Sequence, residues 1–574
     1  MDYSLKIGGQ AGQGLQTIGG LLAKVFSRLG YHVFTHQDYM SRIRGGHNFY
    51  QIRFADRPIS CSRERVNLLV ALDKNTIGIH RPTLAEGGLI IYDAEAVRDR
   101  YEGEEFFDLP AERLAVEKGG DRIMANSAAV GGVLGLLGLD LGAFEEIVRI
   151  TMEKKGEPVV RGNIATGRAG SGFVREYCRR LDSFRTVPSG GERLMLIDGV
   201  TAMGLGALLS GVKLYSAYPM TPSTGVMTFL ASKAKAHGLV VEQAEDEIAA
   251  INMALGASYA GVRAMTGTSG GGFALMQEGF SLAGMTETPL VIAEMQRPGP
   301  ATGLPTRTEQ GDLLFVVHAG HGEFPRVVFA PGTPEQAFLL TNKAFDLAEK
   351  YQVPVFVQGD QYLADSEWTG TGLPTERLVY TDYRLRGDKL AGLPSYKRYQ
   401  FTDNGVSPLA VPGASKHLVV VDSDEHDEEG HIIEDAATRN RMVEKRLFRK
   451  LPLIRQEMAP PSLYGAEQPE IVLAGFGSTW GVMREVVDAL SGRHRIAMLH
   501  FSEVFPLPLT DRFDYLALLR GARVSLCIES NATGQFARLL RAETGFGFTG
   551  RINRYDGRPF TLESLLGEVH AHLG

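Results

Sequence analysis

Short apolar runs alternate along this chain with segments that repeat their apolar positions at helical spacing. The runs at residues 89–92, 290–293, 353–357 and 471–474 are almost entirely apolar. Strands of parallel sheets that are buried on both faces have this pattern. Because such strands alternate here with helical segments, βαβ units are favoured. The pattern therefore predicts an α/β fold with mostly parallel sheets.

Two stretches rich in proline, serine and glycine interrupt this alternation, at residues 183–193 and 457–469. We therefore expect three domains, covering residues 1–182, 194–455 and 470–574. A chain of 574 residues is long enough for three, at roughly 100–200 residues per domain. The pattern loses its regularity from about residue 366 to 455, which predicts an irregular C-terminal excursion of the second domain.

Composition narrows the class of protein. Hydrophobic residues make up 44% and the net charge is −7, which is typical of a globular protein and argues against a nucleic-acid binder. The three cysteines are far apart and form no CxxC, so this chain alone is not expected to hold an iron–sulfur cluster or a zinc ion. Sparse cysteines, no visible signal peptide and no apolar stretch long enough to span a bilayer favour a cytoplasmic protein without membrane association.

Glycine is in excess, with 68 residues, and it is clustered where backbone must come close to a ligand or to another backbone. Near the N-terminus, a strand runs into a turn with Gly12, Gln13 and Gly14, and a helix follows. This geometry suits a phosphate, although the letters match neither GxGxxG nor a P-loop. Arg44, beside two glycines, is a second candidate phosphate contact. A tight turn and an ordinary surface charge remain equally open alternatives.

Three motifs in the second predicted domain suggest a ligand site. Residues 218–224 read Tyr-Pro-Met-Thr-Pro-Ser-Thr, where the prolines restrict Thr221 and suit a hydroxyl directed at a carboxylate, although a helix cap is an alternative. Acidic residues including Glu245 and Glu247 open the next helix, where complementing the helix dipole is the alternative role. Residues 266–272 read Thr-Gly-Thr-Ser-Gly-Gly-Gly, and such a turn lets a flat ligand meet the backbone.

A run of charged residues at 422–431 invites a metal interpretation, but its spacing fits neither an EF-hand nor a compact histidine–carboxylate site. We expect a solvated acidic turn there and no metal site in the chain. Cys527, in an apolar strand, is expected to be a core residue.

Taken in order, these motifs resemble the pyrimidine-binding domain of thiamine-diphosphate enzymes. More narrowly, they resemble the α subunit of the 2-oxoacid:ferredoxin oxidoreductases, together with residues 303–313 and 529–535. Residues 8–20 and the Arg-Gly-Gly at 44–46 resemble the γ subunit of that family, here fused at the N-terminus, and the last domain resembles the C-terminal domain of transketolase. Fused chains with the Asp-Glu-His-Asp-Glu run of residues 424–428 are most typical of the 2-oxoglutarate branch.

The resemblance implies roles for individual residues. Glu247 matches the glutamate that hydrogen-bonds the aminopyrimidine of thiamine diphosphate and promotes proton removal from the thiazolium ring, with Glu245 as the alternative. Thr221 matches the threonine that contacts the 2-oxoacid carboxylate, and Arg297 is its expected partner. Arg307 is the rival of Arg297, or the group that reaches a second carboxylate.

The resemblance also implies partners. Coenzyme A is expected at the γ-like domain, with its phosphates near Gly12, Gln13, Gly14 and Arg44. The chain has no Gly-Asp-Gly motif followed by asparagine, so a β subunit is expected to bring the diphosphate site, Mg²⁺ and an iron–sulfur cluster, in an α2β2 assembly that passes electrons to ferredoxin.

The implied reaction is the coenzyme A-dependent oxidative decarboxylation of 2-oxoglutarate to succinyl-CoA, or its reverse. A subunit acting on pyruvate or a branched-chain 2-oxoacid is the alternative within this chemistry. A non-catalytic module that binds acyl-CoA or a nucleotide is the alternative outside it.

Overall fold

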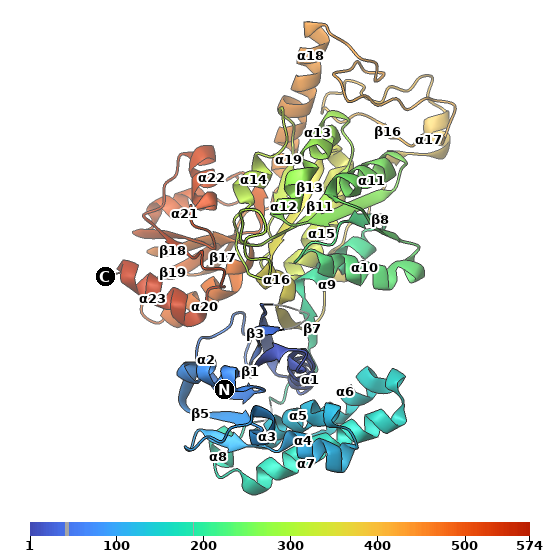
Figure 1. Cartoon of the computed structure of the whole chain (residues 1–574). Coiled ribbons are helices and arrows are strands. Elements are labelled where there is room, and N and C mark those ends of the chain that lie inside the picture. Colours follow the sequence, from blue (N-terminus) through green and yellow to red (C-terminus); the bar gives the residue numbers. More distant parts are fainter. Residues whose placement is uncertain (41–44, 188, 574) are drawn as a thin grey trace. The chain divides into compact units, whose positions relative to one another are not determined.

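The computed structural model of the chain describes residues 1–40, 45–187 and 189–573, which form two compact units (Figure 1). Unit 1 consists of Met1–Ile197, Asp365–Gly372 and Thr561–Gly567, and unit 2 consists of Asp198–Ala364, Leu373–Phe560 and Glu568–Gly574. Both units alternate strands and helices around their sheets, so the predicted α/β class is confirmed.

Unit 1 is built on an eight-stranded sheet in the order β6-β5-β4-β1-β3-β2-β14-β7. Its strands are β1 (Asp2–Ala11), β2 (His32–Asp38), β3 (Gly45–Ala55), β4 (Val66–Ala71), β5 (Leu84–Tyr92), β6 (Phe106–Asp108), β7 (Met195–Asp198) and β14 (Glu367–Gly370). The strands β1, β4, β5 and β6 pair in parallel, whereas β3 pairs antiparallel with both β1 and β2. The sheet is therefore mixed, and β14 joins it from far along the chain through the pair Trp368 and Phe34.

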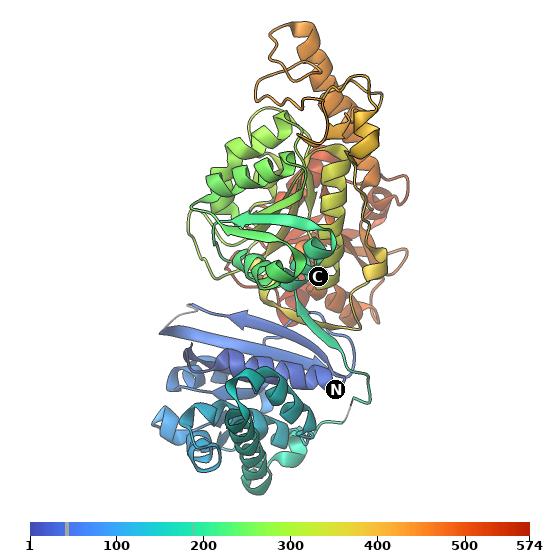
Figure 2. The same ribbon diagram turned by 90° about the vertical axis from the view of Figure 1, so that its right-hand side faces the viewer.

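Helices of unit 1 pack against this sheet around a larger hydrophobic core (Figure 2), and a smaller core on the opposite face contains Ile77, Ala94 and Val97. These helices include α1 (Leu15–Arg28), α2 (Lys74–His80), α3 (Ala94–Val97), α4 (Ala111–Leu114), α5 (Ala125–Leu136), α6 (Gly142–Met152), α7 (Glu157–Tyr177) and α8 (Leu181–Phe184). An ideal Cβ on Gly131 of α5 would lie 1.9 Å from the carbonyl oxygen of Gly167 in α7. Part of the glycine excess therefore serves close helix packing.

The main sheet of unit 2 has seven strands in the order β20-β12-β13-β11-β10-β8-β9. They are β8 (Val212–Ala217), β9 (Val240–Gln243), β10 (Arg263–Thr268), β11 (Leu290–Gln296), β12 (Val327–Phe329), β13 (Pro354–Asp360) and β20 (Glu503–Phe505). All pairs are parallel except that of β12 with β20.

A second sheet of unit 2 has the order β17-β19-β18-β21-β22. Its strands are β17 (Ser462–Gly465), β18 (Ile471–Phe476), β19 (Ile496–Phe501), β21 (Val524–Glu529) and β22 (Gly550–Asn553). Phe476 and Phe501 of this sheet share one hydrophobic core with Phe273 and Phe356. The expected linker 457–469 contains β17, and the C-terminal segment lends β20 to the main sheet. This segment is therefore packed as part of unit 2.

The helices of unit 2 cover both sheets. They are α9 (Gly199–Leu209), α10 (Thr224–His237), α11 (Glu247–Tyr259), α12 (Gly270–Phe273), α13 (Gln277–Met285), α14 (Leu313–Val317), α15 (Pro334–Tyr351), α17 (Gly387–Ala391), α18 (Ala436–Val443), α19 (Leu451–Glu457), α20 (Trp480–Leu490), α21 (Tyr515–Gly521) and α22 (Gln535–Thr544). Two more helices, α16 (Gln361–Asp365) and α23 (Leu562–Leu573), contain residues of both units. No described helix is both long enough and apolar enough to cross a membrane.

The irregular excursion projects from the main sheet with α18 and one pair of two-residue strands, β15 (Arg384–Leu385) and β16 (Leu409–Ala410) (Figure 1). A buried ion cluster anchors it. Glu287, in the turn before β11, pairs with Lys445 at 2.6 Å and with Lys450, and all three side chains are buried. Since one carboxylate faces two buried ammonium groups, losing either charge type there would leave an unpaired buried ion.

The charged run at residues 422–431 is only in part the solvated turn that the spacing predicts, because Asp424, Glu429 and His431 are exposed whereas His426 is buried. The carboxylate of Glu425 pairs with Arg446 at 2.8 Å and with Arg439, and the ring of His426 is fully buried with its centroid 3.8 Å from that of Tyr399. Ion pairing and ring packing therefore fix Glu425 and His426 within the excursion. Among the described residues, no group of three or more metal-ligating side chains could hold a metal ion.

Candidate functional site

The turn rich in proline follows β8 and leads into α10. Ser223 stands at the N-cap of α10, but its hydroxyl donates to the carbonyl of Met220 at 2.8 Å and caps no amide of the helix. Thr221 is half-buried, and its carbonyl accepts a hydrogen bond from Nη1 of Arg297 at 2.9 Å. The structure therefore brings together the two residues that the sequence suggested for a substrate carboxylate.

Glu247 is the first residue of α11, and its neighbour performs the capping. Oδ1 of Asp246 accepts from the backbone N–H of Ala249 at 2.7 Å. Glu247 is buried, and its Oε1 has no hydrogen-bond partner among the residues that the structure describes. Burial raises the pKa of Glu247, although the charge of Arg297 opposes the shift. Glu245, the alternative acid, is exposed. The helix-dipole interpretation thus suits Asp246 better than Glu247.

The glycine turn after β10 lies against this carboxyl group. An ideal Cβ on Gly272 would lie 2.3 Å from Oε1 of Glu247 and 2.2 Å from the hydroxyl of Thr268. Real Cβ atoms do not come that close to other atoms, so only glycine leaves the carboxyl group its place. A buried carboxyl group with an unsatisfied oxygen, beside a backbone without side chains, fits a flat heteroaromatic ring that offers a ring nitrogen.

The two candidate arginines differ in their surroundings. Arg297 follows β11 and is half-buried, and burial lowers its pKa while the charges of Asp312 and Glu247 raise it. Arg307 lies in the next loop, where an ideal Cβ on Gly557 would be 3.1 Å from its Cβ. Arg297 therefore stands next to Thr221 and Glu247, whereas Arg307 is bordered by the C-terminal segment of the same unit.

Three further acids near Arg297 had no predicted role. Burial raises the pKa of Glu309 to about 7 and that of Asp312 to about 6, and it raises the pKa of the fully buried Glu294 well above its ordinary value. The sequence did carry a signal for one of them. Glu294 interrupts an otherwise apolar strand that is buried along its length, where a charged residue is rare unless paired.

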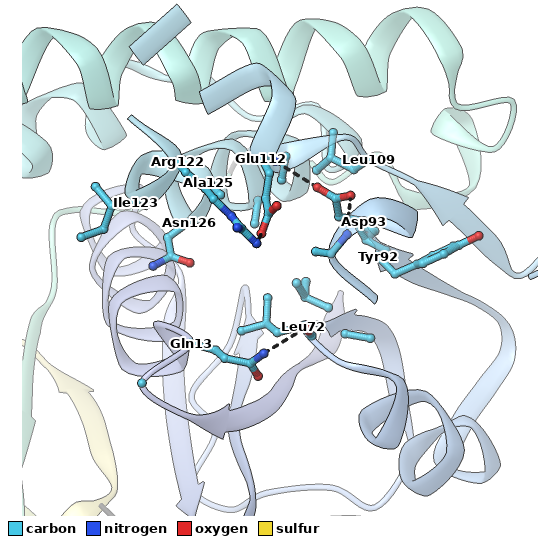
Figure 3. A pocket seen from close by; sticks show the side chains of 17 residues that line it. Gln13, Leu72, Tyr92, Asp93, Leu109, Glu112, Arg122, Ile123, Ala125 and Asn126 are labelled. Carbon is cyan, nitrogen blue, oxygen red and sulfur yellow. Dashed lines mark hydrogen bonds and ion pairs between the residues drawn. The ribbon is translucent and has the colours of Figure 1, made fainter. Parts of the chain in front are cut away.

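In unit 1, the N-terminal glycine turn borders two cavities. One of about 440 Å³ is lined by Gly12, Gln13 and the ends of β4 and β5, and Figure 3 shows its polar side chains. The other, of about 290 Å³, is lined by Gly12, Gly14 and the ends of β2 and β3. Gly12 and Gly14 have φ of 95° and 88°, which favour glycine. The side chain of Gln13 closes the turn, accepting from the N–H of Gln10 at 2.6 Å.

The start of α1 at this turn is open to an anion. Gly14 is the N-cap of α1, and no side chain caps the helix there. The first turn also carries no acidic residue that would repel a phosphate from the helix N-terminus. Inside the larger cavity, Glu112 pairs with Arg122 at 2.6 Å, and Oδ2 of Asp93 accepts from the N–H of Glu112 (Figure 3). Arg44, the other predicted phosphate contact, lies outside the described residues.

Comparisons with known proteins agree with this architecture. A family model described as pyruvate flavodoxin/ferredoxin oxidoreductase, thiamine diphosphate binding, matches residues 205–445, and one described as pyruvate ferredoxin/flavodoxin oxidoreductase matches residues 4–173. The α/β chain therefore carries a thiamine-diphosphate-binding domain and a γ-like domain.

Relatives cover the chain from end to end. A 2-oxoacid:ferredoxin oxidoreductase subunit alpha of Sulfolobus sp is 33% identical over 98% of this chain and 96% of its own length. The 2-oxoglutarate synthase subunit KorA of Methanothermobacter thermautotrophicus is 30% identical over 65% of this chain and 97% of its own length. The structure of 2-oxoglutarate:ferredoxin oxidoreductase from Magnetococcus marinus, with 2-oxoglutarate, coenzyme A and succinyl-CoA bound, superimposes with a TM-score of 0.91 at 30% identity over 100% of both chains.

The chain belongs to the family of 2-oxoacid:ferredoxin oxidoreductase alpha subunits. The resemblance inferred from the motifs is thereby confirmed, and the chain is one subunit of a multi-subunit oxidoreductase.

Gly272→Ala tests whether the contact between the glycine turn and Glu247 matters. The new methyl group must displace the carboxyl group or the Thr268 hydroxyl, so we expect a roughly 10²-fold loss of 2-oxoacid oxidation. Gly271→Ala is the matched control, because its Cβ would meet only the carbonyl oxygen of Ala301, at an ordinary 3.6 Å. Equal activity of the two variants in the assembled enzyme would show that the contact has no importance.

Proposed function

We propose that this chain is the fused γ–α subunit of a 2-oxoglutarate:ferredoxin oxidoreductase. It would take part in the coenzyme A-dependent oxidative decarboxylation of 2-oxoglutarate to succinyl-CoA, or in the reverse reductive carboxylation. Two relatives support this substrate by name, the KorA subunit and the enzyme of Magnetococcus marinus. A second arginine, Arg307, in the loop that follows Arg297, supports a substrate with two carboxylates.

The observation that carries the proposal is the carboxyl group of Glu247. It is buried, its pKa is raised, and one oxygen has no partner in the described chain. A raised pKa favours the protonated form of the carboxyl group, which can give its proton to, or share it with, a ring nitrogen of the aminopyrimidine. When bound, thiamine diphosphate supplies the carbon nucleophile that attacks the keto group.

Thr221 and Arg297 complete this half of the site in the proposal. The guanidinium of Arg297 already donates to the Thr221 backbone, so both residues are fixed relative to each other. The planar fork of an arginine binds a carboxylate through two parallel hydrogen bonds. Arg297 and the Thr221 hydroxyl would therefore orient the 2-oxoacid so that its keto carbon faces the cofactor.

A partner subunit is supported by the surface beside Glu247. Helix α11 is apolar on nearly every side, and Ile248, Met253 and Tyr259 are exposed on it, as is Leu275 after the glycine turn. Helices of this kind are normally buried, and exposed apolar patches of this kind mark interfaces. We propose that a β subunit covers this surface and brings the diphosphate site, Mg²⁺ and an iron–sulfur cluster that reduces ferredoxin, in an α2β2 assembly.

Coenzyme A is the proposed ligand of unit 1. The glycine turn at Gly12 and Gly14 separates two cavities, and the open N-terminus of α1 lies between them. An elongated molecule with a phosphate group in its middle suits this arrangement, because the phosphate would meet the helix N-terminus and the arms would enter the cavities. Gln13 would hold the turn in shape.

Pyruvate or a branched-chain 2-oxoacid is the second candidate substrate, because several alpha-subunit relatives are named only for 2-oxoacids in general. A module without catalysis is disfavoured, since such a protein has no reason to keep a buried unpaired acid, which costs stability.

Glu247→Gln tests the carrying observation. After co-expression with a β subunit, we expect the variant to reduce a low-potential dye roughly 10²- to 10⁴-fold more slowly with 2-oxoglutarate and coenzyme A, because the amide carries no transferable proton. Glu245→Gln, two residues away and exposed, should keep wild-type activity. If the loss appears in Glu245→Gln instead, the two glutamates have been assigned the wrong way round.

The substrate is tested by kcat/KM for 2-oxoglutarate, pyruvate and a branched-chain 2-oxoacid. We expect 2-oxoglutarate to give the highest value, and Arg307→Met to lower it by about tenfold or more while leaving pyruvate unchanged, because one charge-assisted hydrogen bond is lost. A wild-type preference for pyruvate would contradict the proposed substrate, and a loss shared by all three acids would contradict the role of Arg307.

A further inference from the structure

Glu294 occupies an unusual place for a carboxyl group, in the middle of the seven-stranded sheet. It lies on β11 opposite Thr268 of β10 and Gln358 of β13, and it is fully buried. Its Oε2 accepts a hydrogen bond from Nε2 of Gln358 at 3.0 Å. Its Oε1 finds no amide or hydroxyl donor in the part of the chain that the structure describes.

The neighbour of Glu294 is a second acid. The carboxyl group of Asp312 lies close enough to that of Glu294 for the two to share a proton, and Asp360 also faces Glu294. Two touching carboxyl groups in a buried site cannot both be ionised, so the pair must hold a proton. Of the two, only Asp312 also faces a cation, Arg297. The proton therefore belongs with Glu294, and the negative charge with Asp312.

Asp312 connects this pair to the candidate site. An ideal Cβ on Gly270, at the start of the glycine turn, would lie 2.3 Å from its Oδ2, and its backbone N–H donates to Oε1 of Gln296 at 2.9 Å. In the described chain Asp312 makes no ion pair with Arg297, whose guanidinium donates to the Thr221 carbonyl instead. The acid thus stands beside the arginine without binding it directly.

We propose that Glu294 is a positioning residue for Arg297. The carboxyl group of Glu294 donates to Asp312, so Asp312 does not pair with Arg297, and the guanidinium of Arg297 stays available for the carboxylate of the 2-oxoacid. This inference rests on the proposed role of Arg297. A charge-assisted hydrogen bond from Glu294 satisfies Asp312, whereas a buried carboxylate without that donor would pair with the nearest cation. The substrate would then have to displace Asp312 in order to bind.

The pair also gives the proposal a pH signature. Glu294 is faced by Asp312 and Asp360, and Asp312 by Glu294, Glu309 and Arg297. Burial and the neighbouring Asp312 raise the pKa of Glu294 well above its ordinary value, so the shared proton is lost only as the pH rises. When rising pH removes it, two negative charges lie beside Arg297 and pull the guanidinium towards Asp312. The KM for the 2-oxoacid should therefore rise at alkaline pH, with kcat changing less.

Three variants in the assembled enzyme test this. Glu294→Leu removes the donor, so we expect the KM for 2-oxoglutarate to rise about tenfold or more at neutral pH with kcat nearly unchanged. Glu294→Gln keeps a donor that cannot lose its proton, so it should have the wild-type KM at neutral pH and no alkaline rise. Glu309→Gln should retain the alkaline rise. A wild-type KM in Glu294→Leu, or an alkaline rise in Glu294→Gln, would overturn the proposal.

An infrared difference spectrum gives a readout that does not depend on activity. Wild type minus Glu294→Gln at neutral pH should contain the carbonyl band of one protonated carboxylic acid, and absence of that band would overturn the shared proton. Arg297→Lys separates this proposal from the proposed function. An unchanged KM in that variant would refute the substrate role of Arg297, whatever the infrared result, and the positioning role would fall with it.

Discussion

The candidate site depends on one carboxyl group being kept out of water without a partner. Desolvation disfavours the ionised form of Glu247, and no donor in the described chain compensates one of its oxygens. Two neighbours make this state sustainable. Asp246 takes over the capping of α11, and Gly272 leaves the space that any side chain would fill. Burying a carboxyl group with an unpartnered oxygen lowers stability, so its retention in this fold indicates a function for the protonated form of Glu247.

The burial of Glu247 is also related to the need for a partner subunit. As a member of the alpha-subunit family it carries a thiamine-diphosphate-binding domain, yet it lacks the Gly-Asp-Gly motif and any cysteine cluster. The exposed apolar face of α11 lies beside Glu247 in the same unit. A partner subunit bound at this face would exclude water from Glu247 and would also bury the exposed apolar side chains of α11.

Much of this could be predicted from local sequence, because local patterns determine strands, helix starts and glycine turns. The apolar runs at 290–293 and 471–474 lie within β11 and β18, the run at 353–357 overlaps β13 from Pro354 onward, and the motif order indicated the family. Contacts between distant segments could not be predicted. The sequence near residue 367 does not indicate that β14 joins the sheet of unit 1. The sequence near residue 503 does not indicate that β20 joins the seven-stranded sheet of unit 2.

The candidate site shows the same division. Glu247, Thr221 and Arg297 were identified from motifs, and the structure places Thr221 and Arg297 in contact. The acid pair of Glu294 and Asp312 was missed, since the two residues are 18 positions apart and only the sheet brings them together. The burial of His426 was missed for a similar reason, because a charged run looks solvated until its arginine partners, which come from a later helix, are known.

The most direct test of the proton-carrying role of Glu247 is the rate at which the thiazolium C2 proton of bound thiamine diphosphate exchanges with deuterium in the assembled enzyme. This rate reports proton removal before any substrate binds. We expect Glu247→Gln to slow the exchange by about 10²-fold or more, whereas Glu245→Gln should leave it unchanged. Exchange as fast in Glu247→Gln as in wild type would contradict the claim that this chain supplies the proton-carrying acid.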